Sequence, residues 1–253
     1  SGKELNLGGQ WREASLFELI SKAVGQEVTG ETSYDELKKI AADNGVEYDF
    51  VFKDLNDLDR LVDCDYVINC AAETHVDNSI AGSDVFLKSN INGVHNLLKL
   101  ITAKGRYGMP TFVHFSTDEV YGDIDDGSFN ETHLLHPSNP YSATKAGAEE
   151  LTLAYQNTYG VPAIITHTMN VFGERQHPEK YIPGTIAKVR DGELVTVHAD
   201  PSRTRAGSRF YIHARNVADA VLHVMKHGVI GDKYNIVGEV ECDNLHLAQL
   251  IAQ

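Results

Sequence analysis

The chain has 253 residues, which is enough for one large domain or for two unequal ones. Its formal net charge of −14 disfavours nucleic acid and anionic membrane surfaces as partners, although an anionic small molecule could still bind where basic side chains gather. The three cysteines lack the spacing of metal ligands, so we expect no metal site. No apolar run approaches the ~20 residues of a membrane span, and no stretch at the N-terminus resembles a signal peptide, so we expect a cytoplasmic protein.

Short apolar segments alternate with helical patterns through the first two thirds of the chain. We predict strands at residues 48–52, 65–70, 111–115 and 163–166, and helices at residues 16–24, 36–42, 55–62, 85–103 and 142–159. Strands that are separated by helices of ten or more residues are typical of βαβ units. The sequence therefore predicts an α/β fold with a Rossmann-type, doubly wound parallel sheet.

This rhythm breaks near residue 171. The segment that follows mixes Gly, Pro and charge, and we expect in it a helix at 184–191, a strand at 194–198, a helix at 216–227, a strand at 233–237 and a final helix at 245–253. The elements at 216–227 and 233–237 again resemble pieces of the sheet domain. We therefore predict a dinucleotide-binding domain at residues 1–170 and, at 171–253, mostly a smaller substrate-binding lobe with interleaved sheet-domain elements.

Two segments contain side chains suited to chemistry. Residues 116–122 follow a predicted strand and contain a threonine, two adjacent acids and a tyrosine, at the place where open α/β sheets bind ligands. Tyr141 and Lys145 are four residues apart, which places them on one face of a helix. There the lysine ammonium can lower the pKa of the phenol, so that Tyr141 could act as a base near neutral pH. A tyrosinate beside a Thr-Asp-Glu cluster suggests oxidation of an alcohol followed by acid–base elimination.

Four segments together resemble one enzyme family. Residues 71–77 (AAETHVD), 116–122 (STDEVYG), 140–146 (PYSATKA) and 178–183 (PEKYIP) are similar to those of dTDP-glucose 4,6-dehydratases, members of the extended short-chain dehydrogenase/reductase superfamily. The resemblance runs from about Tyr48 to the end of the chain. Related sugar-nucleotide epimerases and decarboxylases usually carry Ser-Ser or Ser-Thr-Ser in the second segment, so the pair Asp118 and Glu119 favours a dehydratase.

The resemblance implies a role for each of five catalytic residues. Tyr141 would remove the proton of the sugar 4-hydroxyl while a hydride passes from C4 to NAD, and Lys145 would lower the pKa of Tyr141 and bind the nicotinamide ribose. Thr117 would hydrogen-bond the 4-oxygen. Glu119 would then remove the C5 proton and Asp118 would protonate the departing 6-hydroxyl, because an elimination needs one ionised and one protonated acid.

The resemblance also implies binding residues. The expected contacts with NAD are Asp54, Leu55, Ala71, Ala72, Thr74, Asn90, Ser116, Tyr141 and Lys145. The expected contacts with a nucleotide-diphosphate hexose are Thr74, His75, Asn170, Lys180 and Arg209. Asp54 could instead, or in addition, cap the helix that follows it, and His75 could be a structural histidine. Arg203 and Arg205 either join the basic cluster that holds the diphosphate or form a solvated surface patch.

The two ends of the chain depart from the family. A dinucleotide fold should open with a strand and a G-x-x-G-x-x-G loop, whereas the nearest candidate, residues 5–9, is followed by Trp11 and Ala14 where glycines would stand. Either the first strand, loop and helix precede Ser1 or the fingerprint has decayed, and we favour the first. The chain also stops within the helical pattern at 245–253, and Val240 stands where the family usually has asparagine.

Two rival functions remain open. The chain could be an NAD-dependent epimerase or decarboxylase of another nucleotide sugar. It could also be a cofactor-free binding relic of the same fold, an idea motivated by the missing glycine fingerprint. Because relatives commonly pair through the helices that correspond to residues 85–103 and 142–159, we expect a homodimer.

Overall fold

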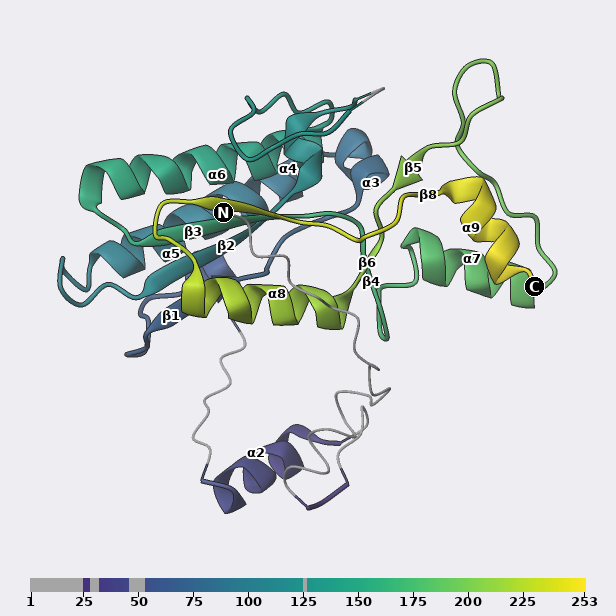
Figure 1. The fold of residues 1–253 in the computed structure, drawn as a ribbon. Coiled ribbons are helices and arrows are strands. Elements are labelled where there is room, and N and C mark those ends of the chain that lie inside the picture. The colour runs from purple at the N-terminus through teal and green to yellow at the C-terminus, as the bar shows by residue number, and fades with distance from the viewer. Residues whose placement is uncertain (1–24, 28–31, 46–52, 125–126) are drawn as a thin grey trace. The chain divides into compact units, whose positions relative to one another are not determined.

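The computed structural model describes residues 25–27, 32–45, 53–124 and 127–253 (Figure 1). The chain divides into two compact units, Ser1–Phe52 and Lys53–Gln253. The elements predicted at residues 16–24 and 48–52, and the fingerprint candidate at 5–9, lie outside the described residues.

Helix α2 (Tyr34–Asp43) lies in the first unit. A reciprocal cap begins it, because the backbone N of Glu36 donates to Ser33 Oγ at 3.3 Å and the backbone N of Ser33 donates to Glu36 Oε2 at 3.0 Å. This capped start confirms the helix that the sequence predicts at residues 36–42.

A four-stranded parallel sheet forms the centre of the second unit. Its strands are β1 (Tyr66–Asn69), β2 (Thr111–Thr117), β3 (Ala163–Thr168) and β7 (Lys233–Ile236). They pair in the order β1-β2-β3-β7, and every pair is parallel. Because parallel strands end at the same edge, the residues after Asn69, Thr117 and Thr168 leave the sheet side by side. The predicted parallel α/β sheet is confirmed.

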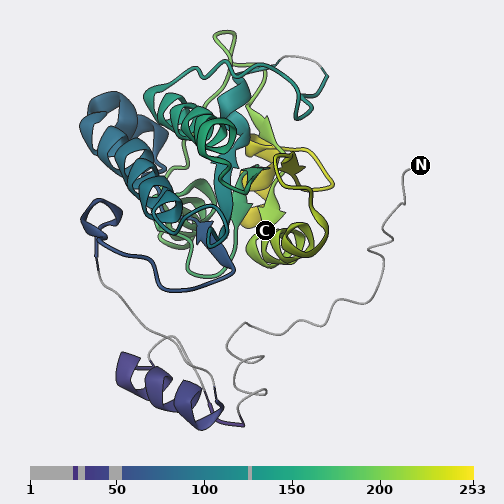
Figure 2. The same cartoon turned by 90° about the vertical axis from the view of Figure 1, so that its left-hand side faces the viewer.

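Helices cover both faces of this sheet (Figures 1 and 2). One face carries α3 (Val76–Ala81), α4 (Asp84–Phe86), the π-helical turn η2 (Leu87–Asn92), α5 (Gly93–Thr102) and α6 (Pro140–Tyr159). The other face carries α8 (Ala214–His227), drawn yellow-green in Figure 2. The elements α4, η2 and α5 follow one another without a break, which confirms the helix predicted at residues 85–103. The sheet is therefore doubly wound.

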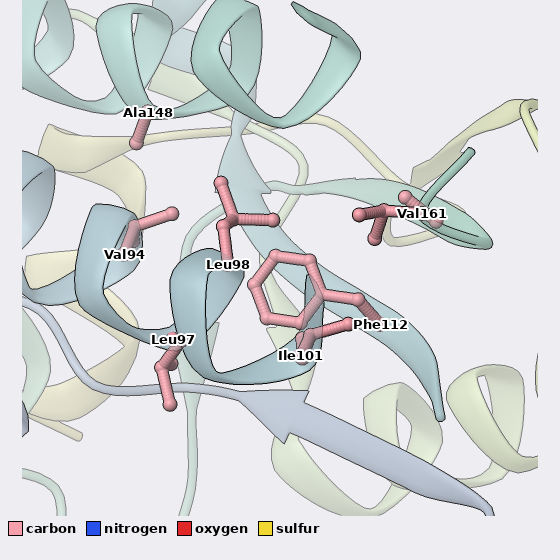
Figure 3. Packing of buried hydrophobic residues seen from close by; sticks show 8 residues of the cluster. Val94, Leu97, Leu98, Ile101, Phe112, Ala148 and Val161 are labelled. Carbon is pink, nitrogen blue, oxygen red and sulfur yellow. The ribbon is translucent and has the colours of Figure 1, made fainter. Parts of the chain in front are cut away.

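An apolar cluster joins α5 and α6 to β2. Leu98, Ile101 and Phe112 have no exposed surface, and Ala148 points from α6 toward them (Figure 3). Burying a large apolar side chain contributes roughly 1.5–3 kcal/mol, so these contacts fix both helices on the sheet. A second cluster joins Val113 of β2 to residues of α8 on the opposite face. The position of α6 relative to β2 matters because both elements carry predicted catalytic residues.

Shorter elements follow β3. Strand β4 (Val171–Phe172) pairs with β6 (Ile212–His213), and β5 (Ser208–Arg209) pairs with β8 (Cys242–Asp243). Helices α7 (Tyr181–Arg190) and α9 (Asn244–Ile251) lie beside each other at the right of Figure 1. Strand β7 returns to the main sheet, so the chain after residue 171 alternates between the two regions. Among the helices of the described ranges, none combines the length and the apolar character needed to cross a membrane.

Two predicted elements are wrong. The helix expected at residues 55–62 is a single 3-10 turn, η1 (Leu55–Asp57), because Leu58 is extended with ψ 130°. The strand expected at residues 194–198 does not form: Leu194 is 87% exposed, and the nearest pairing is an isolated bridge between Ala199 and Ala206. An apolar run becomes a strand only where a neighbouring strand pairs with it, and the sequence of the run does not contain that information.

Candidate active site

Strand β2 brings the two adjacent acids to the carboxyl edge of the sheet. Thr117 ends the strand, and its Oγ1 accepts a hydrogen bond from the backbone N of Glu119 at 3.4 Å, which starts the 3-10 turn η3 (Asp118–Tyr121). Gly122 ends this turn at φ 84°, and a Cβ there would lie 2.4 Å from the carbonyl oxygen of His136. The turn therefore requires glycine at this position, and it holds both carboxyl groups where the sheet ends.

The first turn of α6 brings Tyr141 to the same place. Asn139 caps the helix by accepting the backbone N–H of Ser142 at 2.9 Å, and Pro140 occupies the first turn. The Nδ2 of the same amide donates to Glu119 Oε2 at 3.2 Å. Asn139 thus joins the start of the Tyr141 helix to the Glu119 carboxyl group.

Lys145 lies one turn after Tyr141 and is 4% exposed. Its Nζ donates to the carbonyl oxygen of Phe115 at 2.5 Å. Burial lowers the pKa of Lys145 to about 8, while Cys70 and Glu149 act in the opposite direction. The side chain is therefore a buried amine held against β2.

The pKa of Tyr141 moves in the direction opposite to the one predicted. Burial raises this pKa above its ordinary value, and the charge of Glu119 raises it further, while a hydrogen bond with Thr117 has a smaller lowering effect. The spacing of Tyr141 and Lys145 predicts a lowered pKa, and the structure differs because the phenol is buried and lies close to the Glu119 carboxylate.

Asp118 keeps its proton to a higher pH than an ordinary aspartate. Burial raises its pKa to about 6, with a further contribution from Glu119, whereas Arg209 and the hydrogen bond from Thr117 act to lower it. The neighbouring Glu119 instead accepts a hydrogen bond from the Asn139 amide. An elimination needs one protonated acid and one ionised base, and two adjacent carboxyl groups in different surroundings can supply both.

The raised pKa of Asp118 leads to a stability prediction. Because the pKa in the folded protein is about 6 and the ordinary value is 3.8, folding favours the protonated carboxyl, and its ionisation destabilises the fold as the pH rises through 6. Asp118→Asn imitates the protonated form, so it should raise the free energy of unfolding by about 2–3 kcal/mol near pH 8 and by almost nothing below about pH 4.

Urea unfolding at these two pH values measures the difference. The matched control is Asp123→Asn, since this neighbouring carboxyl is exposed. A gain of the same size at both pH values would show that the effect does not come from ionisation of Asp118.

Asp54 and Leu55, two of the residues predicted to contact NAD, have clear structural roles. The Oδ1 of Asp54 accepts the backbone N–H of Asn56 at 2.9 Å and caps η1, which is one of the two alternatives that the sequence leaves open. Lys88 Nζ lies 3.4 Å from the other oxygen of Asp54. Leu55 packs against the core cluster beneath α5. Neither role prevents contact with a cofactor at the exposed side of Asp54.

Asn90 fixes the loop that follows β1. Its Oδ1 accepts the backbone N–H of Glu73 at 2.8 Å, and its Nδ2 donates to the Glu73 carbonyl at 3.0 Å and to Thr144 Oγ1 at 2.9 Å. The same loop contains Ala71 and Ala72, whose small side chains allow a ligand to approach the backbone closely. Asn90 therefore connects this loop to α6.

Two basic residues from the later part of the chain reach the acidic cluster. Lys180 Nζ donates to the carbonyl oxygen of Thr74 at 2.8 Å, and burial lowers its pKa while the charge of Glu119 raises it. Arg209 is close enough to Asp118 to lower the pKa of that carboxyl. The structure thus brings together residues from the loop after β1, from η3, from the start of α7 and from β5.

The remaining predicted contacts are less closely tied to this cluster. His75 caps α3, because its Nδ1 accepts the backbone N–H of Asn78 at 3.4 Å. Asn170 is exposed between β3 and β4. Arg203 and Arg205 line a surface pocket of about 610 Å³ formed by the loop before β5 and by α9. Within the described ranges, no group of His, Cys, Asp and Glu could hold a metal ion.

Sequence comparisons connect this geometry to known proteins. The family model for GDP-mannose 4,6 dehydratase matches residues 18–253. The chain is 42% identical over 208 residues to the low-salt glycan biosynthesis protein Agl12 of Haloferax volcanii, covering 82% of this chain and 64% of that protein. It is 41% identical over 189 residues to a dTDP-glucose 4,6-dehydratase of an Actinoplanes species, covering 75% and 57%. The chain belongs to the nucleotide-sugar 4,6-dehydratase family.

Solved structures of dehydratases share the fold. The crystal structure of the dTDP-glucose 4,6-dehydratase DesIV from Streptomyces venezuelae, with NAD bound, is similar with a TM-score of 0.75 and 35% identity, covering 87% of this chain and 66% of that one. The NAD complex of the Bacillus anthracis enzyme gives 0.63 and 30%, covering 89% and 63%. The chain thus spans about two thirds or less of the length of these dehydratases.

The dehydratase motifs do not identify the buried residues behind the site. The Ser116 hydroxyl, predicted to face the cofactor, is buried and donates to Glu149 Oε2 at 3.0 Å. Glu149 lies four residues after Lys145, so the helical spacing that identifies Lys145 would also have found it. Asn139 could have been found as an N-cap, because an asparagine directly before a proline is a common start of a helix.

Proposed function

We propose that the protein is an NAD-dependent 4,6-dehydratase of a nucleotide-activated hexose, with dTDP-glucose as the first substrate to test. The observation that carries this proposal is the adjacent pair Asp118 and Glu119 beside Tyr141, in which burial keeps Asp118 protonated to a higher pH than an ordinary aspartate. The family to which the chain belongs supports the same reaction. The predicted division into residues 1–170 and a substrate lobe at 171–253 is part of this proposal.

The residues at the carboxyl edge fit the nicotinamide end of NAD. Lys145 offers a buried amine one turn from Tyr141, and Ala71 and Ala72 are small residues in the loop after β1, which Asn90 holds in place. Bound NAD would supply the acceptor and later the donor of the hydride, and its nicotinamide would bring a positive charge that favours the ionised form of a nearby phenol. That charge would act against the raised pKa of Tyr141.

The chain's own residues then divide the proton transfers. Thr117 holds the 4-oxygen while Tyr141 takes its proton. Glu119 removes the proton from C5, which the neighbouring ketone acidifies, and Asp118 gives its proton to the departing 6-hydroxyl, so that one water leaves. Each transfer by a positioned acid or base is worth about 10²–10⁴-fold in rate.

The test is to incubate the protein with NAD and dTDP-glucose in deuterated water and to analyse the sugar. A 4-keto-6-deoxy product with deuterium at C5 is expected, and the same assay with UDP- and GDP-hexoses ranks the nucleotides. A product that is only inverted at C4, with no deuterium at C5, would establish an epimerase instead.

Arg209 provides a prediction about substrate binding. We propose that its guanidinium holds the diphosphate, so Arg209→Ala should weaken binding of dTDP by roughly 1.5–3 kcal/mol, the range for a hydrogen bond to a charged group. Titration calorimetry measures this, with Arg190→Ala as the control because Arg190 pairs with Asp191 on the surface. Equal dTDP affinity in the two variants would remove Arg209 from the binding site.

We also propose a cytoplasmic homodimer. Large apolar side chains are exposed on the helices expected to pair, with Val85, Leu87 and Tyr159 each at least 45% exposed. A homodimer that pairs these helices would cover such side chains. Sedimentation at micromolar concentration tests the proposal, and a monomer there would contradict it.

A further inference from the structure

Helix α6 carries a third polar side chain, that of Glu149, on the same face as Tyr141 and Lys145. Glu149 follows Lys145 by four residues and Tyr141 by eight, so the three side chains point from one face of the helix. Glu149 has no exposed surface. Because an ionised carboxylate is rarely buried in this way without partners, its contacts indicate its role.

Each oxygen of the Glu149 carboxylate is bound. Oε2 accepts the hydroxyl of Ser116 at 3.0 Å and lies 2.9 Å from His167 Nε2, and Oε1 accepts Lys233 Nζ at 2.7 Å. Burial raises the pKa of Glu149, but His167 and Lys233 outweigh it, and the pKa lies below its ordinary value. The carboxylate is therefore charged, and it connects α6 to three strands: β2, β3 and β7.

The hydrogen bonds continue from His167 to the end of the segment 116–121, which contains the proposed catalytic residues Thr117, Asp118 and Glu119. Tyr121, the last residue of η3, places its hydroxyl 3.0 Å from His167 Nδ1 and donates it to Asn235 Oδ1 at 3.0 Å. The orientation of the Asn235 amide is fixed, because its Nδ2 donates to the Phe129 carbonyl at 3.2 Å. The phenol has a single proton and donates it to Asn235, so it can only accept a hydrogen bond from His167 Nδ1. Every hydrogen bond of this network then has a donor if His167 donates from both ring nitrogens, one to Tyr121 and one to Glu149.

We propose that Glu149 is the positioning residue of the catalytic segment 116–121. It holds the first residue of that segment through Ser116 and the last through His167 and Tyr121, and in doing so it sets the acids Asp118 and Glu119 against the helix of Tyr141. The role as a positioning residue for dehydration rests on the proposed function. Glu149 itself touches neither substrate nor cofactor in this role.

The test compares Glu149→Gln with Glu150→Gln, its exposed neighbour on α6. Glu149→Gln keeps the shape and removes the charge, so kcat should fall by roughly 10–100-fold, the range found when a partner that orients a metal ligand is removed. KM should change little, because the basic residues proposed to hold the nucleotide lie on other elements. Glu149→Asp keeps the charge on a side chain that is one methylene shorter. Its kcat should therefore lie between those of the parent and of Glu149→Gln.

A second measurement does not depend on activity. Amide hydrogen exchange in residues 116–122 should become roughly tenfold faster or more in Glu149→Gln, because a buried charged hydrogen-bond partner is lost, and should stay unchanged in Glu150→Gln. Tyr121→Phe, which removes one hydroxyl at the other end of the network, should accelerate exchange in the same segment. This variant also serves if Glu149→Gln does not fold.

The outcomes separate the two proposals. If kcat, KM and exchange of Glu149→Gln all match those of Glu150→Gln, Glu149 is not a positioning residue. The same conclusion follows if Glu149→Gln does not fold and Tyr121→Phe leaves exchange and kcat unchanged. If the parent protein converts no nucleotide hexose, the dehydratase proposal fails, and the exchange comparison still decides whether Glu149 holds the segment.

Discussion

Tyr141→Phe should lower kcat for dehydration by about 10²–10⁴-fold and leave the fold intact, because it removes only the hydroxyl of the proposed base. The ring of Tyr141 is buried and packs edge-on against Phe86, and the phenylalanine can keep that contact. Steady-state turnover measured beside circular dichroism and a thermal melt tests both parts of this expectation.

The control is Tyr159→Phe at the exposed end of the same helix, where loss of a hydroxyl should leave turnover unchanged. If Tyr141→Phe turns over substrate at a rate close to that of the parent, Tyr141 is not the base. A variant that loses both activity and its cooperative melt would instead show that the hydroxyl is needed for folding, through its hydrogen bond with Thr117.

Asp118→Asn combined with Glu119→Gln should stop elimination while slow oxidation at C4 continues. Both changes nearly conserve shape, and neither alters Tyr141 or Lys145. The loss should reach at least the 10²–10⁴-fold expected for one missing acid or base, because both proton transfers at C5 and C6 lose their group. A single-turnover experiment that follows the ultraviolet absorbance of reduced NAD, beside deuterium incorporation at C5, separates the two half-reactions.

The result that would falsify the roles of the two acids is a double variant that forms 4-keto-6-deoxy sugar at the parent rate. The companion variant Asp123→Asn, outside η3, should behave like the parent in both measurements. A double variant that also fails to oxidise C4 would mean that the acids orient the sugar as well, since Glu119 shares the Asn139 amide with the start of the Tyr141 helix.

The candidate catalytic residues can be identified in the sequence because local rules place them. The spacing of Tyr141 and Lys145 follows from the period of a helix, and the acids are identified by their place directly after a strand. The strands at 65–70, 111–115 and 163–166 are predicted for a similar reason, since each is a short apolar run flanked by turns, and all three form.

Electrostatics and long-range contacts are harder to predict. The pKa of Tyr141 depends on burial and on Glu119, neither of which is evident from the spacing to Lys145. The partners of Glu149 are equally hidden, because His167 lies 18 residues away in the chain and Lys233 lies 84 residues away. Such contacts arise only when β3 and β7 pair beneath α6, so a local pattern cannot reveal them.

The π-helical turn η2 limits how many residues this part of the chain can have. The backbone N–H of Gly93 bonds to the Lys88 carbonyl, five residues back, so this turn contains one residue more than a regular helix would need. One added residue rotates everything after it by roughly 100° about the helix axis. The same continuous helix can therefore aim Asn90 at the loop before it and still aim Leu98 into the core. Deleting one residue between Leu87 and Asn92 would yield a more regular helix, which could keep either the contact of Asn90 with the loop or the packing of Leu98 in the core, but not both. Natural variation in this segment should therefore consist of substitutions and not of insertions or deletions.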